Sequence, residues 1–188
     1  MKSQFREIVD VCPVIAAVKD DAGLEKALAS ECAIIFVLYG DLLSIESIVA
    51  KIKAQKKIAM VHLDLITGLG TKEVSVEYLA EKVQADGIIS TKPALIKKAR
   101  EIGLYTVLRL FILDSMSFNN LPKQCELARP DCIEILPGVM PKIISRVKEN
   151  EKVPLIAGGL ISDKEDIYSA LNAGARAIST TRCELWDV

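Results

Sequence analysis

The feature that most constrains the fold of this 188-residue chain is a regular alternation of short apolar runs with amphipathic stretches. Seven stretches with helical periodicity span residues 23–30, 44–55, 73–84, 93–103, 117–129, 140–150 and 163–174. The apolar runs, which we expect to be strands, span residues 14–19, 33–40, 58–65, 87–91, 105–113, 132–136, 155–158 and 177–180. Strict alternation of this kind admits an open doubly wound sheet or a closed barrel.

Composition and an internal repeat favour the barrel. Hydrophobic residues make up 51% of the chain and aromatic residues only 5%, which suits an aliphatic parallel sheet buried on both faces. Residues 85–92 (ADGIISTK) and 175–182 (ARAISTTR) align without gaps at the ends of the fourth and eighth predicted strands. Equivalent strands in two halves of a barrel would behave this way, although chance is the competing explanation for so short a match. We predict a compact (β/α)8 TIM-type barrel with short loops and a reduced last helix, as a single domain over residues 1–188.

Several predicted helix boundaries have a physical basis. Pro93 and Pro141 stand where the first turn of a helix tolerates proline. The segment 162–165 (SDKE) has the spacing of a capping box, and Gly103 and Gly174 follow helices as C-terminal caps. The fifth helical stretch is the weakest, because a proline lies inside it.

Charge and cysteine content exclude several classes of protein. The formal net charge is −1, so no global basic field indicates nucleic acid. Five cysteines without a Cys-x-x-Cys pair and a single histidine argue against a metal site and for reduced thiols. Charges interrupt the N-terminal stretch, so we expect no signal peptide, and no apolar run could span a membrane. We expect a cytoplasmic protein without a metal ion.

Polar residues gather at the predicted carboxyl ends of the strands, where the functional face of a parallel barrel lies. A charge within an apolar strand is costly unless it is paired or meets a ligand. Each charged residue in these strands could therefore form an internal salt bridge, contact a ligand, or do both. His62 and Asp64 are two residues apart and should share a side of the third strand, with His62 a hydrogen-bonded interior residue. The charged candidates for a ligand pocket are Lys19, Asp64, Lys92, Arg109 and Glu134.

The last two strand ends indicate a phosphate site. Gly158 and Gly159 follow the seventh strand, and Thr180 and Thr181 end the eighth. Loops after strands seven and eight of such barrels often bind phosphate through backbone N–H groups, and glycine permits close approach. We predict these four residues as phosphate donors, with Arg182 as a candidate charge partner. A tight turn that needs glycine for packing is the alternative.

The motifs DGIISTK, EILPGVMPKII and IAGGLISDKED, with IAAVK, IIFVLYGDLLSI, VHLDLITGL and AISTT, occur here in an order that resembles the glycerol uptake operon antiterminator family. The resemblance spans about Val14 to Trp186. It implies a barrel that responds to glycerol-3-phosphate and binds the leader mRNA of glycerol-utilisation genes, preventing premature termination. The predicted phosphate site then becomes the effector site, and the five charged candidates line the rest of its pocket.

Two further expectations concern partners and chemistry. RNA binding requires a basic surface, and the candidates are residues 51–57, 97–100 and 146–152, each also typical of a solvated outer helix. Assembly into a homo-oligomer is compatible with the sequence, and no cofactor besides the effector is expected. The alternative function is an aldolase, isomerase or lyase acting on a small sugar phosphate, with Lys19 or Lys92 next to Asp64 or Glu134.

Overall fold

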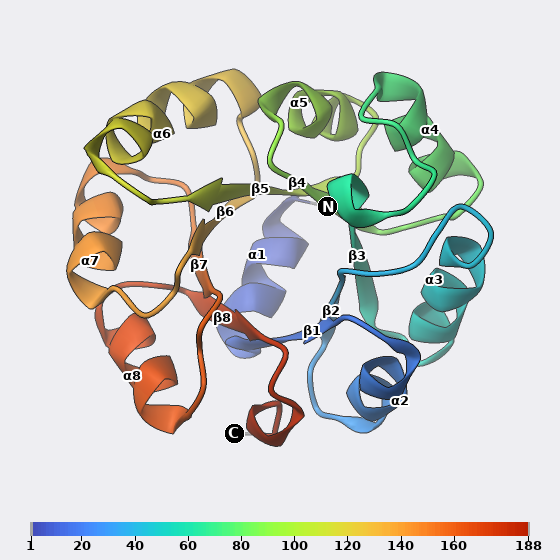
Figure 1. Ribbon diagram of the computed structural model, residues 1–188, viewed down its shortest axis with the longest axis horizontal. Helices are drawn as coiled ribbons and strands as arrows, with labels where there is room; N and C mark the ends of the chain where they lie inside the picture. The colour runs from blue at the N-terminus through green and yellow to red at the C-terminus, as the bar shows by residue number, and fades with distance from the viewer. Residues whose placement is uncertain (1, 188) are drawn as a thin grey trace.

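Eight parallel strands close into a barrel in the computed structural model, which describes residues 2–187 (Figure 1). Each strand pairs with its sequence neighbours, and the last pairs with the first. The predicted closed barrel is therefore confirmed over the open sheet. The strands are β1 (Val14–Val18), β2 (Ile34–Val37), β3 (Ile58–His62), β4 (Gly87–Ser90), β5 (Tyr105–Phe111), β6 (Cys132–Leu136), β7 (Leu155–Gly158) and β8 (Ala177–Thr180).

A ring of helices surrounds the strands and buries their outward faces (Figure 1). The helix after β8 is reduced, as predicted, to the short 3-10 turn η2 (Cys183–Leu185). Trp186 follows it, and its indole N–H donates to the Thr180 carbonyl at 2.9 Å. The outer helices are α2 (Asp21–Ala29), α3 (Ile45–Ala54), α4 (Glu73–Glu81), α5 (Pro93–Glu101), α6 (Ser115–Ala128), α7 (Pro141–Asn150) and α8 (Lys164–Asn172).

A further helix that the sequence analysis did not predict, α1 (Lys2–Val11), closes the amino-terminal end of the barrel. In Figure 1 it lies behind the strands, so the carboxyl ends of the strands face the viewer. Phe5 and Val9 are buried among the residues that fill the barrel, and the Phe5 ring stacks on Tyr105 with centroids 4.8 Å apart. The spacing of Phe5, Ile8 and Val9 on one helical face is the signal that could have revealed this helix.

Two helix starts differ from the sequence predictions. The cap of α8 is Asp163 rather than Ser162, and its side chain accepts from the N–H of Asp166. Ser162 instead donates its N–H and hydroxyl to the Asp166 carboxylate. The helix α6 begins before its predicted start, with Asp114 as its cap, and continues through Pro122 because its apolar face is buried against the barrel.

The interior of the barrel changes from apolar to polar along its axis. Because side chains alternate between the two faces of a strand, every second residue points inward. Near α1 these residues are apolar, such as Met60, Val107 and Ile156. At the carboxyl ends of the strands, the buried inward residues are His62, Arg109, Glu134 and Ser179. This polar layer forms the floor of the candidate site.

Candidate functional site

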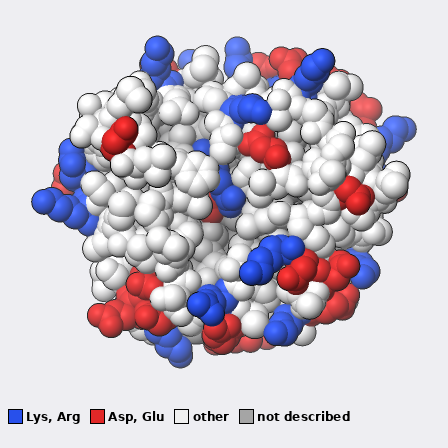
Figure 2. Space-filling model, viewed as in Figure 1, with Lys and Arg blue, Asp and Glu red and all other residues white. Residues whose placement is uncertain are grey.

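A cavity of about 120 Å³, here called the mouth cavity, lies above this polar layer at the carboxyl ends of β5 to β8. Figure 2 shows the same face, with most charged side chains around the rim and basic atoms inside a central hollow. The residues that line the mouth cavity are Ala17, Leu38, Arg109, Glu134, Leu136, Gly159, Leu160, Ile161, Ser179, Thr180 and Thr181. The structure thus brings five of the predicted site residues, Arg109, Glu134, Gly159, Thr180 and Thr181, together at one cavity.

A hydrogen-bonded ion pair forms the floor of the mouth cavity. Arg109 on β5 donates from Nε to the Glu134 carboxylate of β6 at 2.5 Å. Ser179 on β8 donates to the other oxygen of that carboxylate, also at 2.5 Å. All three side chains are buried, and β5 and β6 hold Arg109 and Glu134 in register. Arg109 and Glu134 are thus paired with each other, as one interpretation of the sequence predicted, and both also line the cavity; their contact with a ligand stays a prediction.

The two adjacent glycines serve different purposes. A Cβ on Gly158 would lie 2.5 Å from Glu134 Oε1 and 2.7 Å from Ser179 Oγ, so glycine leaves room for the buried network. Gly159 has φ +78°, in the left-handed region that glycine adopts without strain. Packing within the protein therefore explains Gly158, which does not itself line the mouth cavity.

Backbone N–H groups without a protein acceptor within residues 2–187 gather at this loop. Leu160 also has a positive φ of 63°, which is rare for a branched residue, and its side chain is exposed. Strained backbone of this kind concentrates at ligand-binding sites. Within residues 2–187, the N–H groups of Gly159, Leu160 and Thr181 donate to no protein acceptor, although all three residues line the mouth cavity. An anion placed here would provide acceptors for donors that the fold leaves unused.

The two repeated segments, residues 85–92 and 175–182, make equivalent hydrogen bonds in the structure. The Ser90 hydroxyl accepts from the N–H of Lys92 at 3.1 Å, and the Thr180 hydroxyl accepts from the N–H of Arg182 at the same distance. Each hydroxyl then donates to the preceding strand-end loop: Ser90 to Asp64, and Thr180 to the Ile161 carbonyl. The hydroxyl of Thr180 therefore holds the loop and is not free to donate to a ligand.

Three of the predicted pocket residues lie apart from the mouth cavity. The strand β3 ends at His62, and Asp64 belongs to the 3-10 turn η1 (Leu63–Leu65), so the predicted common strand for these two residues is wrong. The Asp64 carboxylate accepts from Thr91 N–H at 2.7 Å and supports the β4 loop. Lys19 and Lys92 are exposed just beyond β1 and β4. Within residues 2–187, neither lysine has a carboxylate within 4.0 Å, so the lysine–carboxylate pair of the enzyme alternative is not assembled.

His62 is a member of the polar floor whose surroundings the sequence did not predict. Its side chain is 2% exposed, and Nδ1 has no hydrogen-bond partner among the described residues. Burial, followed by the nearby positive charge of Arg109, lowers the pKa of the imidazole to about 4. The ring is therefore neutral at physiological pH; His62 is an interior residue, as expected, and its Nδ1 is left without a hydrogen bond among the described residues.

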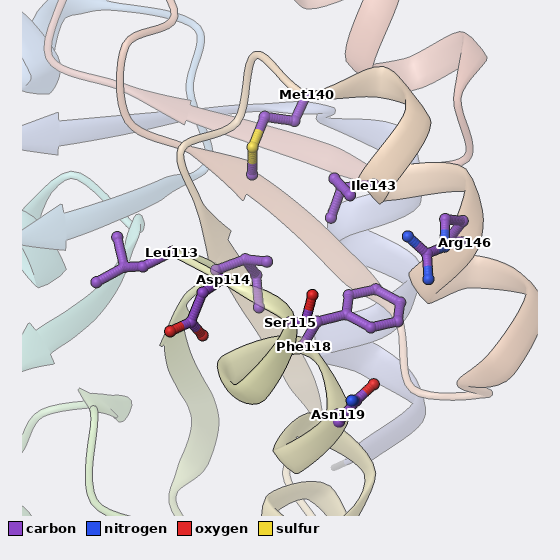
Figure 3. A pocket seen from close by; sticks show the side chains of 9 residues that line it. Leu113, Asp114, Ser115, Phe118, Asn119, Met140, Ile143 and Arg146 are labelled. Atoms are coloured by element: carbon purple, nitrogen blue, oxygen red, sulfur yellow. The ribbon is translucent and has the colours of Figure 1, made fainter.

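A second, larger hollow of about 500 Å³ lies outside the barrel, between the start of α6 and α7 (Figure 3). Among the described residues, Arg146 is the one cation that lines it, and its guanidinium stacks over the Phe118 ring at 4.4 Å. Asp114 also lines this hollow, and its carboxylate caps α6. A carboxylate repels anions and the one cation is engaged with a ring, so this hollow suits a small organophosphate less well than the mouth cavity does.

The closed parallel barrel and its polar mouth define the chain as a (β/α)8 barrel with a candidate ligand site at the carboxyl ends of its strands. Residues 14–186 match the family described as glycerol-3-phosphate responsive antiterminator. The chain belongs to this family, as the sequence motifs indicated. The predicted function, antitermination of transcription in response to glycerol-3-phosphate, is the function for which the family is named.

Individual relatives agree with this assignment. The uncharacterized protein YgcP of Escherichia coli K12 is 52% identical over 176 residues, covering 94% of this chain and 92% of that protein. The glycerol uptake operon antiterminator regulatory protein of Listeria monocytogenes is 31% identical, with a TM-score of 0.89 and coverage of 92% and 94%. An antiterminator-related protein of Thermotoga maritima is 32% identical, with a TM-score of 0.82 and coverage of 92% and 96%. Enzyme barrels at 12–17% identity share the fold alone.

Two features are absent from residues 2–187. No group of three or more His, Cys, Asp or Glu side chains in this part of the chain could hold a metal ion. No helix within it is long and apolar enough to cross a membrane.

Proposed function

We propose that this protein binds glycerol-3-phosphate in the mouth cavity and, in that state, binds the leader mRNA of glycerol-utilisation genes and prevents premature termination. The observation that carries the proposal is the set of backbone donors at Gly159, Leu160 and Thr181, which have no acceptor within residues 2–187 and border a buried polar floor. Leader transcripts are made in the cytoplasm, so the proposal places the protein there.

The two ends of the effector would meet different chemistry. The phosphate would accept hydrogen bonds from the three N–H groups and from the Thr181 hydroxyl. The glycerol hydroxyls would face Arg109 and Glu134, where a donor and an acceptor lie side by side. Lys19, at the end of β1, would meet the effector at the rim, whereas Asp64 and Lys92 would act on the β4 loop.

The proposed role is regulatory rather than enzymatic. Binding and release of an effector require no proton transfer or covalent step, and the lysines of the enzyme alternative lie apart from carboxylates. If the effector favours the RNA-binding state, RNA must raise the affinity for glycerol-3-phosphate by the same factor.

Calorimetric titration of the purified protein with glycerol-3-phosphate tests the effector site. Thr181→Glu, which adds a negative charge at an exposed cavity residue, should abolish binding, while Thr71→Glu, an equal charge change at an exposed residue outside the cavity, should not. Repeating the titration with a leader transcript should give the same coupling factor in both directions. Wild-type affinity in Thr181→Glu, or turnover of glycerol-3-phosphate, would contradict the proposal.

A further inference from the structure

A basic groove of about 730 Å³ runs between α5 and α6 on the outside of the barrel, here called the α5–α6 groove. Figure 1 shows these two helices side by side. Two basic residues from α5 and two from the end of α6 line it, against two glutamates, Glu101 and Glu126. An exposed leucine, Leu127, adds an apolar surface between the charges. The four basic residues are Lys97, Arg100, Lys123 and Arg129.

Among residues 2–187, these four cations have no ionic partner, unlike Lys51 of α3 and Lys98 of α5. Between α2 and α3, Lys51 lies 3.2 Å from Glu25. Between α4 and α5, Lys98 lies 2.6 Å from Glu77. Among the described residues, none of the four groove cations has a carboxylate within 4.0 Å, although two glutamates line the same groove. Their charges are therefore available to an external polyanion.

The end of α6 holds one wall of the groove in place. Arg129 is the C-cap of α6 and has a left-handed backbone, with φ 47° and ψ 53°, a conformation uncommon for arginine. Two residues later, the Asp131 carboxylate is buried and accepts from the N–H and the hydroxyl of Thr106 on β5, at 3.0 and 2.9 Å. This buried anchor fixes the path of the chain that presents Arg129.

We propose that the α5–α6 groove holds the sugar-phosphate backbone of the leader mRNA. This inference rests on the proposed function, because it assigns a surface to the RNA. Unpaired cations on two adjacent helices can contact successive phosphates, and Leu127 can pack against a sugar or a base. A chain with a net charge of −1 needs such a local concentration of cations to hold RNA.

The groove is also connected to the mouth cavity through one strand. The strand β5 joins α5 to α6, and it carries both Thr106, which anchors the groove wall, and Arg109, which lines the cavity. A ligand that holds Arg109 therefore acts on the element between the two groove helices. This arrangement predicts that glycerol-3-phosphate raises RNA affinity in the wild type.

The test compares two variants with equal loss of charge. Lys97→Gln/Arg100→Gln/Lys123→Gln removes three of the four groove cations, and Lys51→Gln/Lys53→Gln/Lys56→Gln removes three of the four lysines in the basic stretch on and after α3. The affinity for a fluorescently labelled leader transcript is measured by anisotropy over a range of salt concentrations, with glycerol-3-phosphate present. The groove variant should bind about 100-fold more weakly at 0.1 M salt, and its log–log salt slope should fall by about 2, because about 0.7 counterions per single-strand phosphate are no longer released.

Further measurements separate the outcomes. The groove variant should keep the wild-type affinity for glycerol-3-phosphate, which shows that it is folded, and Lys97→Arg/Lys123→Arg should keep RNA binding. If the wild type binds RNA and the groove variant binds it equally well, or if the α3 variant loses as much affinity, the groove assignment is wrong while the proposed function stands. If the wild type binds no RNA, both fail. Competition by polyglutamate as strong as that by the transcript would indicate an acidic protein partner and would also overturn the assignment.

Discussion

Removing the charge of Glu134 tests whether the floor of the mouth cavity is a buried ion pair. In Glu134→Gln the side chain keeps its volume, so no cavity forms, but the Arg109 guanidinium loses its only ionic partner among the described residues. The Glu134 side chain is 0% exposed and that of Arg109 is 8% exposed, so solvent offers little compensation. Removing one partner of such a pair costs about 3–5 kcal/mol. For a chain of this size, that corresponds to a fall in Tm of roughly 6–20 °C.

The assay is urea unfolding followed by circular dichroism. Two variants serve as references. Arg109→Met/Glu134→Gln removes the uncompensated charge and should be destabilised by less than the sum of its two single variants. Lys51→Met breaks the exposed pair with Glu25, and should change the free energy of unfolding by no more than about 1 kcal/mol. A loss below about 1 kcal/mol in Glu134→Gln, with an unchanged m-value, would refute the buried pair.

Three further changes probe the interior. Because His62 is neutral in the folded protein, the protein should become less stable as pH falls from 6.5 to about 4, the window in which only the unfolded chain binds the proton. The total loss in the free energy of unfolding is about 3 kcal/mol. His62→Gln should flatten the pH profile of unfolding. Gly158→Ala should lower the free energy of unfolding by about 1–3 kcal/mol, since its Cβ would lie 2.5 Å from Glu134 Oε1. Gly70→Ala, with no atom within 4 Å of its Cβ, should be close to neutral in the same urea assay. Phe5→Ala should cost about 3–5 kcal/mol by opening the amino-terminal end of the barrel, and a Tm near that of the wild type would show that α1 is dispensable.

Much of the fold could be predicted because it depends on local patterns. The alternation of apolar runs and amphipathic stretches specifies strands and helices, and buried aliphatic strands favour a parallel sheet. The repeat between residues 85–92 and 175–182 was detectable because equivalent hydroxyls at two strand ends make equivalent hydrogen bonds. Strand-end position likewise placed Arg109, Glu134 and Gly159 on one face, where they line one cavity, since parallel strands bring their carboxyl ends together.

The sequence by itself thus predicted the order of the strands and of helices α2 to α8, favoured the closed barrel and indicated the face that carries the candidate site. Only the tertiary structure decided how individual side chains are used there. It directs the Thr180 hydroxyl to the Ile161 carbonyl, makes Gly158 a space for the Glu134 carboxylate, and gathers the cations of α5 and α6 into one groove. The physical reason is the separation along the chain of the residues involved. Strand and helix periodicity depends on neighbours a few residues apart. The surroundings of a buried or charged side chain depend on distant segments that only folding brings together.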